Sequence, residues 1–140
     1  CVHTINYNKE NFVERVKEIT GGKGVPVVYD SIGKDTFTGS LDCLSPLGMM
    51  VSFGGASGPV PPFSLNELAS RGSLFVTRPS LFNYIAKRDD LEMMAAELFG
   101  MVESGKIKID INQRYALKDV AQAHRDLESR KTTGSTILLP

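Results

Sequence analysis

The sequence predicts an α/β fold built around a parallel β-sheet. Short apolar runs alternate with amphipathic segments along the first 80 residues, which is the order of strands joined by crossover helices. The runs over residues 25–29 and 49–53 are apolar on both faces, as in strands that helices cover on both sides. Glycine or proline follows most of these segments and separates one element from the next.

The first half is predicted to alternate strands with helices. The first helix stops at a pair of glycines, and the second stops before Ser45-Pro46, because the residue before proline disfavours helical backbone. Residues 58–62 hold three prolines and form a stiff loop. Strand–helix–strand repeats predict parallel strands with right-handed crossovers. We expect strands over residues 2–7, 25–29, 49–53 and 74–77, and helices over residues 10–20, 37–44 and 66–71.

The second half follows a different pattern, and we place a boundary near Ser80. Asp89 and Glu92 predict a capping box at the start of a helix that ends at Gly105. Isoleucines alternate with polar residues over 107–111, as in a half-buried strand. A helix over residues 119–129 and a strand over residues 137–139 complete the chain. This half is predicted to be the return segment of another domain.

Composition and charge exclude several classes of protein. The chain has 140 residues, with 16 basic and 16 acidic residues and a formal net charge of zero. A dedicated binder of nucleic acid or of anionic membranes needs a basic excess, and no apolar run approaches the roughly 18 residues of a membrane-spanning helix. Two cysteines form no disulfide framework, which favours a reducing, cytoplasmic compartment. Because the chain opens on Cys1 within a strand-like run, we expect a piece of a longer protein.

Three strand ends collect the candidate functional residues. Residues 29–33, 52–58 and 77–80 each follow a predicted strand, and open parallel sheets bind ligands outside the carboxyl ends of their strands. Gly54 and Gly55 would let backbone groups approach a ligand closely. No helix opens directly after them, so the helix N-terminus that holds a pyrophosphate is missing. Ordinary turns explain the three segments equally well.

Other polar residues favour structural roles. Glycines 21–24 indicate a helix stop rather than a phosphate cradle. His124 shares a stripe with apolar residues and is expected to pack in a core, and Cys43 is expected to be a small buried hydrophobe. His3 has no second ligand cluster for a metal, and no serine has a histidine partner that would indicate a hydrolase. Arg130 lies just beyond the last helix, where it either caps the helix or anchors a phosphate.

Taken in order, these segments resemble the zinc-free, bacterial quinone oxidoreductase branch of the medium-chain dehydrogenase/reductase superfamily, and more distantly zeta-crystallin. The resemblance covers essentially the whole chain. It implies a partial Rossmann domain, the later part of an NADP-binding domain, over residues 1–80, and a linking helix with the C-terminal return segment of the substrate domain over residues 81–140. The glycine-rich fingerprint and any zinc ligands would lie upstream. The motifs that carry it include residues 28–33 (VYDSIG), 50–54 (MVSFG), 72–80 (GSLFVTRPS) and 127–130 (LESR).

The resemblance implies binding roles at the strand ends, with no catalytic acid or base and no metal ligand in this stretch. An aromatic phenol suits both base and phosphate, and a guanidinium takes phosphate oxygens bidentately. The implied NADPH contacts are Tyr7 at the adenosine end near the 2′-phosphate, Ser31 and Ile32 beside adenine and ribose, Phe53, Gly54 and Gly55 near the nicotinamide ribose, Thr77, Arg78 and Pro79 along the nicotinamide, and Arg130 as a basic residue that reaches the cofactor.

The implied activity is hydride transfer from NADPH to a quinone, with the cofactor supplying the hard chemistry. The preference for NADPH over NADH rests on Tyr7 and Arg130 by this resemblance. The parent chain would be the enzyme and would form a homodimer through the edge strand from Leu74 to Thr77, while the 140-residue piece alone is expected to be inactive. Two alternatives stay open: a non-catalytic structural or dimerisation module of the zeta-crystallin type, and a sister enzyme such as an enoyl reductase or a zinc alcohol dehydrogenase.

Overall fold

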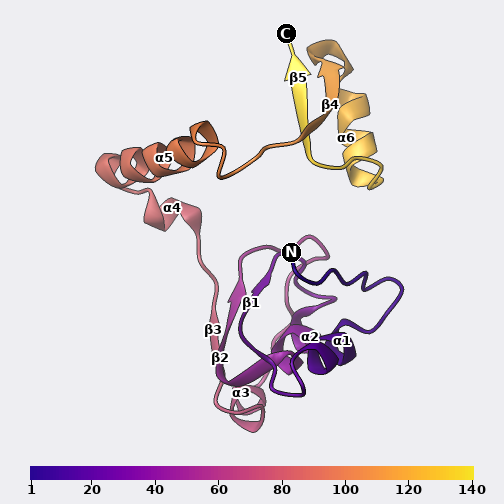
Figure 1. The fold of residues 1–140 in the computed structure, drawn as a ribbon, viewed down its shortest axis with the longest axis vertical. Coiled ribbons are helices and arrows are strands. Elements are labelled where there is room, and N and C mark those ends of the chain that lie inside the picture. The colour runs from indigo at the N-terminus through magenta and orange to yellow at the C-terminus, as the bar shows by residue number, and fades with distance from the viewer. The chain divides into compact units, whose positions relative to one another are not determined.

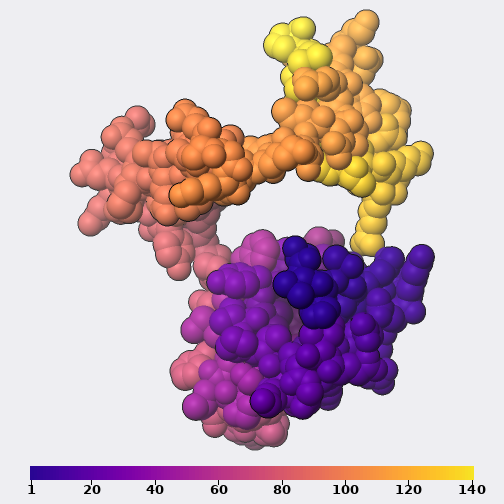
Figure 2. Space-filling model, viewed as in Figure 1, coloured from indigo at the N-terminus to yellow at the C-terminus, as the bar shows by residue number.

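The computed structural model describes residues 1–140, which divide into two compact units, Cys1–Asn83 and Tyr84–Pro140. Figure 1 shows the elements of each unit, and Figure 2 shows the N-terminal segment, in indigo, on the surface of the first unit. Each unit contains a parallel sheet, as the predicted α/β class requires. No helix combines the length and the apolar character needed to cross a membrane.

The first unit holds a three-stranded parallel sheet in the order β1-β2-β3, formed by β1 (Val25–Asp30), β2 (Leu44–Ser52) and β3 (Phe75–Thr77). The register pairs Asp30 with Ser52 and Val51 with Thr77. The three strands therefore end at the same edge of the sheet, which is where parallel sheets hold their ligands.

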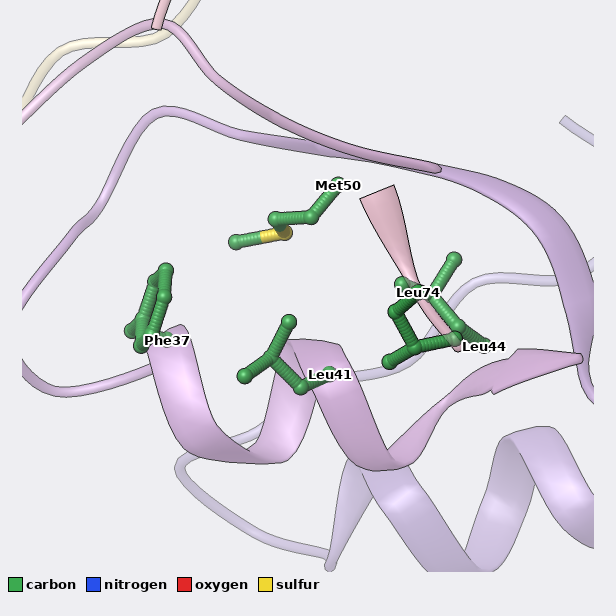
Figure 3. Close-up of a cluster of buried hydrophobic side chains, with 5 residues drawn as sticks. All are labelled: Phe37, Leu41, Leu44, Met50 and Leu74. Carbon is green, nitrogen blue, oxygen red and sulfur yellow. The ribbon is translucent and has the colours of Figure 1, made fainter. Parts of the chain in front are cut away.

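One helix, α2 (Phe37–Asp42), packs on one face of this sheet and forms the core with it. Helix α1 (Phe12–Ile19) packs against α2, and α3 (Asn66–Ser70) follows β2 along the chain. Asn11 begins α1 by accepting hydrogen bonds from the amides of residues 13 and 14. Figure 3 shows the buried cluster between α2 and the sheet, in which Leu41 and Met50 are 1% and 0% exposed. The cluster consists of Phe37, Leu41, Leu44, Met50 and Leu74.

The second unit is a helix followed by a strand–helix–strand motif. After the short α4 (Leu81–Tyr84), it contains α5 (Arg88–Glu103), β4 (Ile111–Ala116), the 3₁₀ turn η1 (Leu117–Asp119), α6 (Val120–Glu128) and β5 (Ser135–Leu139). Strands β4 and β5 pair in parallel, and α6 is the crossover between them. The Tyr115 hydroxyl donates to Asp126 at 2.9 Å and ties β4 to α6.

Two predicted strands are wrong because their backbone finds no partner. Residues 2–7 form no strand, and Val2 is 93% exposed. Residues 107–110 are also irregular, and the strand starts only at Ile111, where pairing with β5 begins. A strand exists through hydrogen bonds to a neighbouring strand, so alternation along the sequence is insufficient. Strands β1 and β2 also differ from the prediction that helices cover both of their faces. They bury one face only, and Tyr29 and Met49 on the other face are exposed.

Three local predictions also need correction. The capping box of Asp89 and Glu92 does not form, because α5 starts one residue earlier and Glu92 pairs with Arg88 at 2.6 Å. Strand β2 begins at Leu44 rather than at residue 49, through an irregular register that accommodates a proline. His124 is exposed rather than packed in a core. It lines an apolar groove of about 160 Å³ with Val120, Ala123, Leu127, Thr136 and Leu138.

Candidate functional site

The carboxyl end of β1 is organised by a buried carboxylate. Asp30 is the last residue of the strand and is 4% exposed. Its Oδ1 accepts from the amides of Ile32 at 2.7 Å and Gly33 at 3.0 Å, which closes a tight turn. Its Oδ2 accepts from the hydroxyls of Thr36 at 2.7 Å and Ser40 at 2.9 Å, both from the segment that forms α2. Two backbone donors and two hydroxyl donors thus converge on one side chain.

These donors keep the carboxylate ionised although it is buried. Burial raises the pKa of Asp30, but the hydrogen bonds from Thr36, Gly33, Ser40 and Ile32 together lower it below its ordinary value. A charged group without a positive partner therefore persists in the interior, because every hydrogen bond it receives favours the charged form.

A first cavity of about 210 Å³ opens at this strand end, and we call it the β1-end cavity. It brings together Tyr7, Ser31 and Ile32, all of which the resemblance assigned to the adenosine end of the cofactor. Aromatic surfaces and hydroxyls make its wall suited to a flat, polar ligand. The full lining is Tyr7, Phe12, Tyr29, Asp30, Ser31, Ile32, Thr36 and Ser40.

A second cavity of about 320 Å³ lies at the ends of β2 and β3, and we call it the β2-end cavity. It brings together Gly54, Gly55 and Arg78 from the predicted set. The rings of Phe37 and Phe63, 4.9 Å apart between centroids, form part of its apolar wall. The guanidinium of Arg78 is the cationic group of this wall. The full lining is Phe37, Ser52, Gly54, Gly55, Pro59, Val60, Phe63, Val76 and Arg78.

The loops that follow β1 and β2 interlock. The Phe53 amide donates to the Asp30 carbonyl at 2.9 Å, and the Ser57 hydroxyl donates to the Ile32 carbonyl at 2.8 Å. Gly54 lies directly against Ser31, so a Cβ at this position would sit 2.7 Å from the Ser31 Cα and overlap the backbone. Glycine is required here for close approach of two backbones, and the two cavities therefore share one rigid rim.

The other predicted residues lie apart from the cavity walls. Phe53 is half exposed, and Thr77 and Pro79 flank Arg78 along the chain without lining either cavity. Arg130 belongs to the second unit, directly after α6, where its φ of 57° places it in the left-handed region. Its amide donates to the Leu127 carbonyl at 3.0 Å, as in a helix C-terminus.

Sequence reasoning missed the group that shapes the site. Asp30, Thr36 and Ser40 are absent from the predicted contacts, although an aspartate followed by Ser-Ile-Gly is a typical turn signal. Thr36 and Ser40 follow Asp30 by six and ten residues. Neither spacing matches a helical or strand period that would predict a contact with the end of β1. The chain contains no cluster of three or more His, Cys, Asp or Glu side chains that could hold a metal ion.

Comparisons with known proteins agree with this architecture. The zinc-binding dehydrogenase family matches residues 1–138. A quinone oxidoreductase of Pseudomonas aeruginosa is 56% identical over 137 residues, which are 98% of this chain and 42% of that protein. The crystal structure of Escherichia coli quinone oxidoreductase complexed with NADPH superposes with a TM-score of 0.91 and 55% identity, covering 97% of this chain and 42% of that one. A 2-haloacrylate reductase of Burkholderia is 48% identical over all of this chain and 42% of its own length.

The chain thus spans about two fifths of the length of the relatives it matches. The partial Rossmann-type fold and the resemblance to quinone oxidoreductases, both expected from the sequence, are confirmed. This chain belongs to the zinc-binding dehydrogenase family, and its similarity to the quinone oxidoreductases of that family extends over almost all of its residues.

Proposed function

We propose that this chain forms part of the cofactor site of an NADPH-dependent quinone oxidoreductase, with the whole protein transferring hydride from NADPH to a quinone. The observation that carries the proposal is the pair of cavities at the ends of parallel strands, whose walls include six of the predicted contact residues. The similarity to a relative crystallised with NADPH supports the same cofactor. When bound, the nicotinamide supplies the hydride.

The residues present suit the two ends of a dinucleotide. Tyr7 offers an aromatic surface and a phenol at the β1-end cavity, while Gly54 and Gly55 keep side chains away from the rim of the β2-end cavity. Arg78 contributes a positive charge beside apolar walls, which favours an anionic group. We assign the adenosine end to the first cavity and the nicotinamide end to the second. Phe53, Thr77 and Pro79 would contact the cofactor through their backbones, and Arg130 would reach a phosphate.

The proposal also covers the domain boundary, the absence of zinc, the compartment and the dimer. We infer that residues 1–80 are the later part of the NADP-binding domain and residues 81–140 the return segment of the substrate domain, that the reaction proceeds without zinc, and that the protein works in the reducing cytoplasm. The protein would form a homodimer through β3. Its support is that β3 pairs on one side only, with β2, and that Phe75 on it is 56% exposed. Light scattering on the whole protein tests the dimer.

The decisive experiment measures NADPH oxidation by the whole protein with a panel of quinones and 2-haloacrylate. Oxidation that depends on a quinone supports the proposal. The similarity to a 2-haloacrylate reductase makes reduction of an activated double bond the second candidate, and activity with 2-haloacrylate alone would favour it. Absence of any NADPH oxidation would favour a non-catalytic role and contradict both.

Cofactor binding by the chain itself is a separate measurement. We expect the 140-residue chain to bind NADPH far more weakly than the whole protein, and to show no turnover, because the glycine-rich turn that holds the pyrophosphate is not part of it. Calorimetric titration of both proteins compares the two affinities. Equal affinity would contradict the assignment of the pyrophosphate contacts to another part of the protein.

A further inference from the structure

We propose that Asp30 is a positioning residue, whose carboxylate fixes the turn that presents Ser31 and Ile32 at the β1-end cavity. The proposal deepens the proposed function, because it rests on this turn forming one end of the cofactor site.

All of the hydrogen bonds to the Asp30 carboxylate come from inside the protein. Both oxygens are occupied, Oδ1 by two amides of the turn and Oδ2 by two hydroxyls, at 2.7 to 3.0 Å. No buried polar side-chain atom in the chain lacks a partner. The carboxylate therefore holds structure in place, and it leaves no free oxygen for a ligand.

The four donors explain why a carboxylate occupies this position. A carboxylate only accepts hydrogen bonds, whereas an asparagine would present its Nδ2 donors to one pair of partners. The hydroxyls of Thr36 and Ser40 can rotate and accept from such an amide, but the amides of Ile32 and Gly33 cannot. Asparagine can therefore keep the turn if its oxygen faces the amides, and alanine leaves these amides without partners.

Asp30 also connects the two loops of the site. Its backbone carbonyl accepts from the amides of Phe53 at 2.9 Å and Gly54 at 3.4 Å, while its side chain organises the turn of residues 31–33. The same turn packs closely against the next loop, because Gly54 leaves no room for a Cβ beside the Ser31 backbone. The geometry of the β1-end cavity thus depends on a residue whose side chain bonds only to the protein.

The test compares Asp30→Ala, Asp30→Asn and the control Asp35→Asn, an exposed aspartate in the same loop. Amide hydrogen exchange at Ile32 and Gly33 measures the turn, and NADPH titration of the whole protein measures the site. We expect Asp30→Ala to speed exchange at both amides about tenfold and to weaken NADPH binding about fivefold or more. We expect Asp30→Asn to restore most of both, and the control to change neither.

The two readouts separate the two proposals. If the chain and the whole protein bind no NADPH, the proposed function fails, while amide exchange still decides the role of Asp30. Unchanged exchange in Asp30→Ala, or a loss of affinity no larger than in Asp35→Asn, overturns the positioning role. Should Asp30→Ala fail to fold, Asp30→Asn and Thr36→Val replace it. Thr36→Val removes one donor to Oδ2, and exchange two- to threefold faster at both amides is then the supporting result, while wild-type exchange overturns the role.

Discussion

The two units bury their side chains in different ways. The first unit has a hydrophobic core of five residues and buries four polar residues, Asp30, Thr36, Ser40 and Ser52, at or below its strand ends. In the second unit only Ala123 is buried, and apolar side chains such as Leu127 on α6 are more than half exposed. The first unit therefore carries its own packing, whereas the second presents an apolar groove between α6 and β5.

The two units therefore obtain their stability from different sources. In the first unit, close packing fixes the strand ends, and hydrogen bonds then fix the loops at the site. In the second, hydrogen bonds such as the one between Tyr115 and Asp126 tie helix to sheet, but little apolar area is removed from water. A two-stranded parallel sheet is too small to bury its faces alone. We therefore expect the second unit to depend on packing against a surface outside the unit itself.

The greatest contrast in unfolding free energy between the units is expected when one leucine in each is replaced by alanine. Leu41→Ala, at a side chain that is 1% exposed, should lower the free energy of unfolding by about 3 kcal/mol, since it loses burial and leaves a cavity. Leu127→Ala, at a side chain that is 57% exposed, should change it by less than about 0.5 kcal/mol. Urea denaturation followed by circular dichroism measures both. Equal losses would show that the second unit has a core comparable with that of the first.

Replacing a glycine by alanine should change the free energy of unfolding in opposite directions in the two units. Gly54→Ala places a Cβ against the Ser31 backbone, and we expect a loss of about 2 kcal/mol or more. Gly100 lies within α5, and a Cβ added there would meet open space, so Gly100→Ala should stabilise that helix by about 0.5–1 kcal/mol.

Thermal unfolding of both glycine variants gives the two signs directly. NADPH titration should respond to Gly54→Ala and not to Gly100→Ala, because only the first glycine lines a candidate cavity. A Gly54→Ala variant with wild-type stability would mean that the loops after β1 and β2 can separate at little cost, and the shared rim would then be a weaker constraint on the site.

The sequence was sufficient where an element carries its own periodicity and stop signals. Helices predicted over residues 10–20 and 119–129 formed as α1 and α6 within two residues at either end. The strand over residues 2–7 failed, and the strand over residues 107–111 formed only at its last residue, because pairing depends on another segment of chain, which no local pattern encodes. The site was half predictable for the same reason. Strand ends identified Ser31 and Gly54, but the donors that surround Asp30 come together only when α2 packs below β1.

The smallest expected effect concerns acid, and it compares one carboxylate from each unit. In Asp30, burial raises the pKa and the hydrogen bonds outweigh it; in Asp126, which is partly exposed, hydrogen bonds from Gln122 and Tyr115 lower the pKa. A carboxylate whose pKa is lower in the folded state stabilises the fold above its unfolded pKa of about 3.9, and this contribution is lost as the pH falls through the folded value.

The stability difference between wild type and Asp30→Asn should therefore be constant near neutral pH and shrink below about pH 4, where the carboxyl of Asp30 begins to bind a proton in the unfolded chain. Asp126→Asn should show the same direction with a smaller amplitude, because solvent screens a partly exposed carboxylate in both states. Carbon-detected NMR titration of the two carboxyls, with denaturation at about pH 3 to 7, measures both. If Asp30 titrates at or above its ordinary pKa, its hydrogen bonds do not offset its burial. The buried charge would then destabilise the first unit.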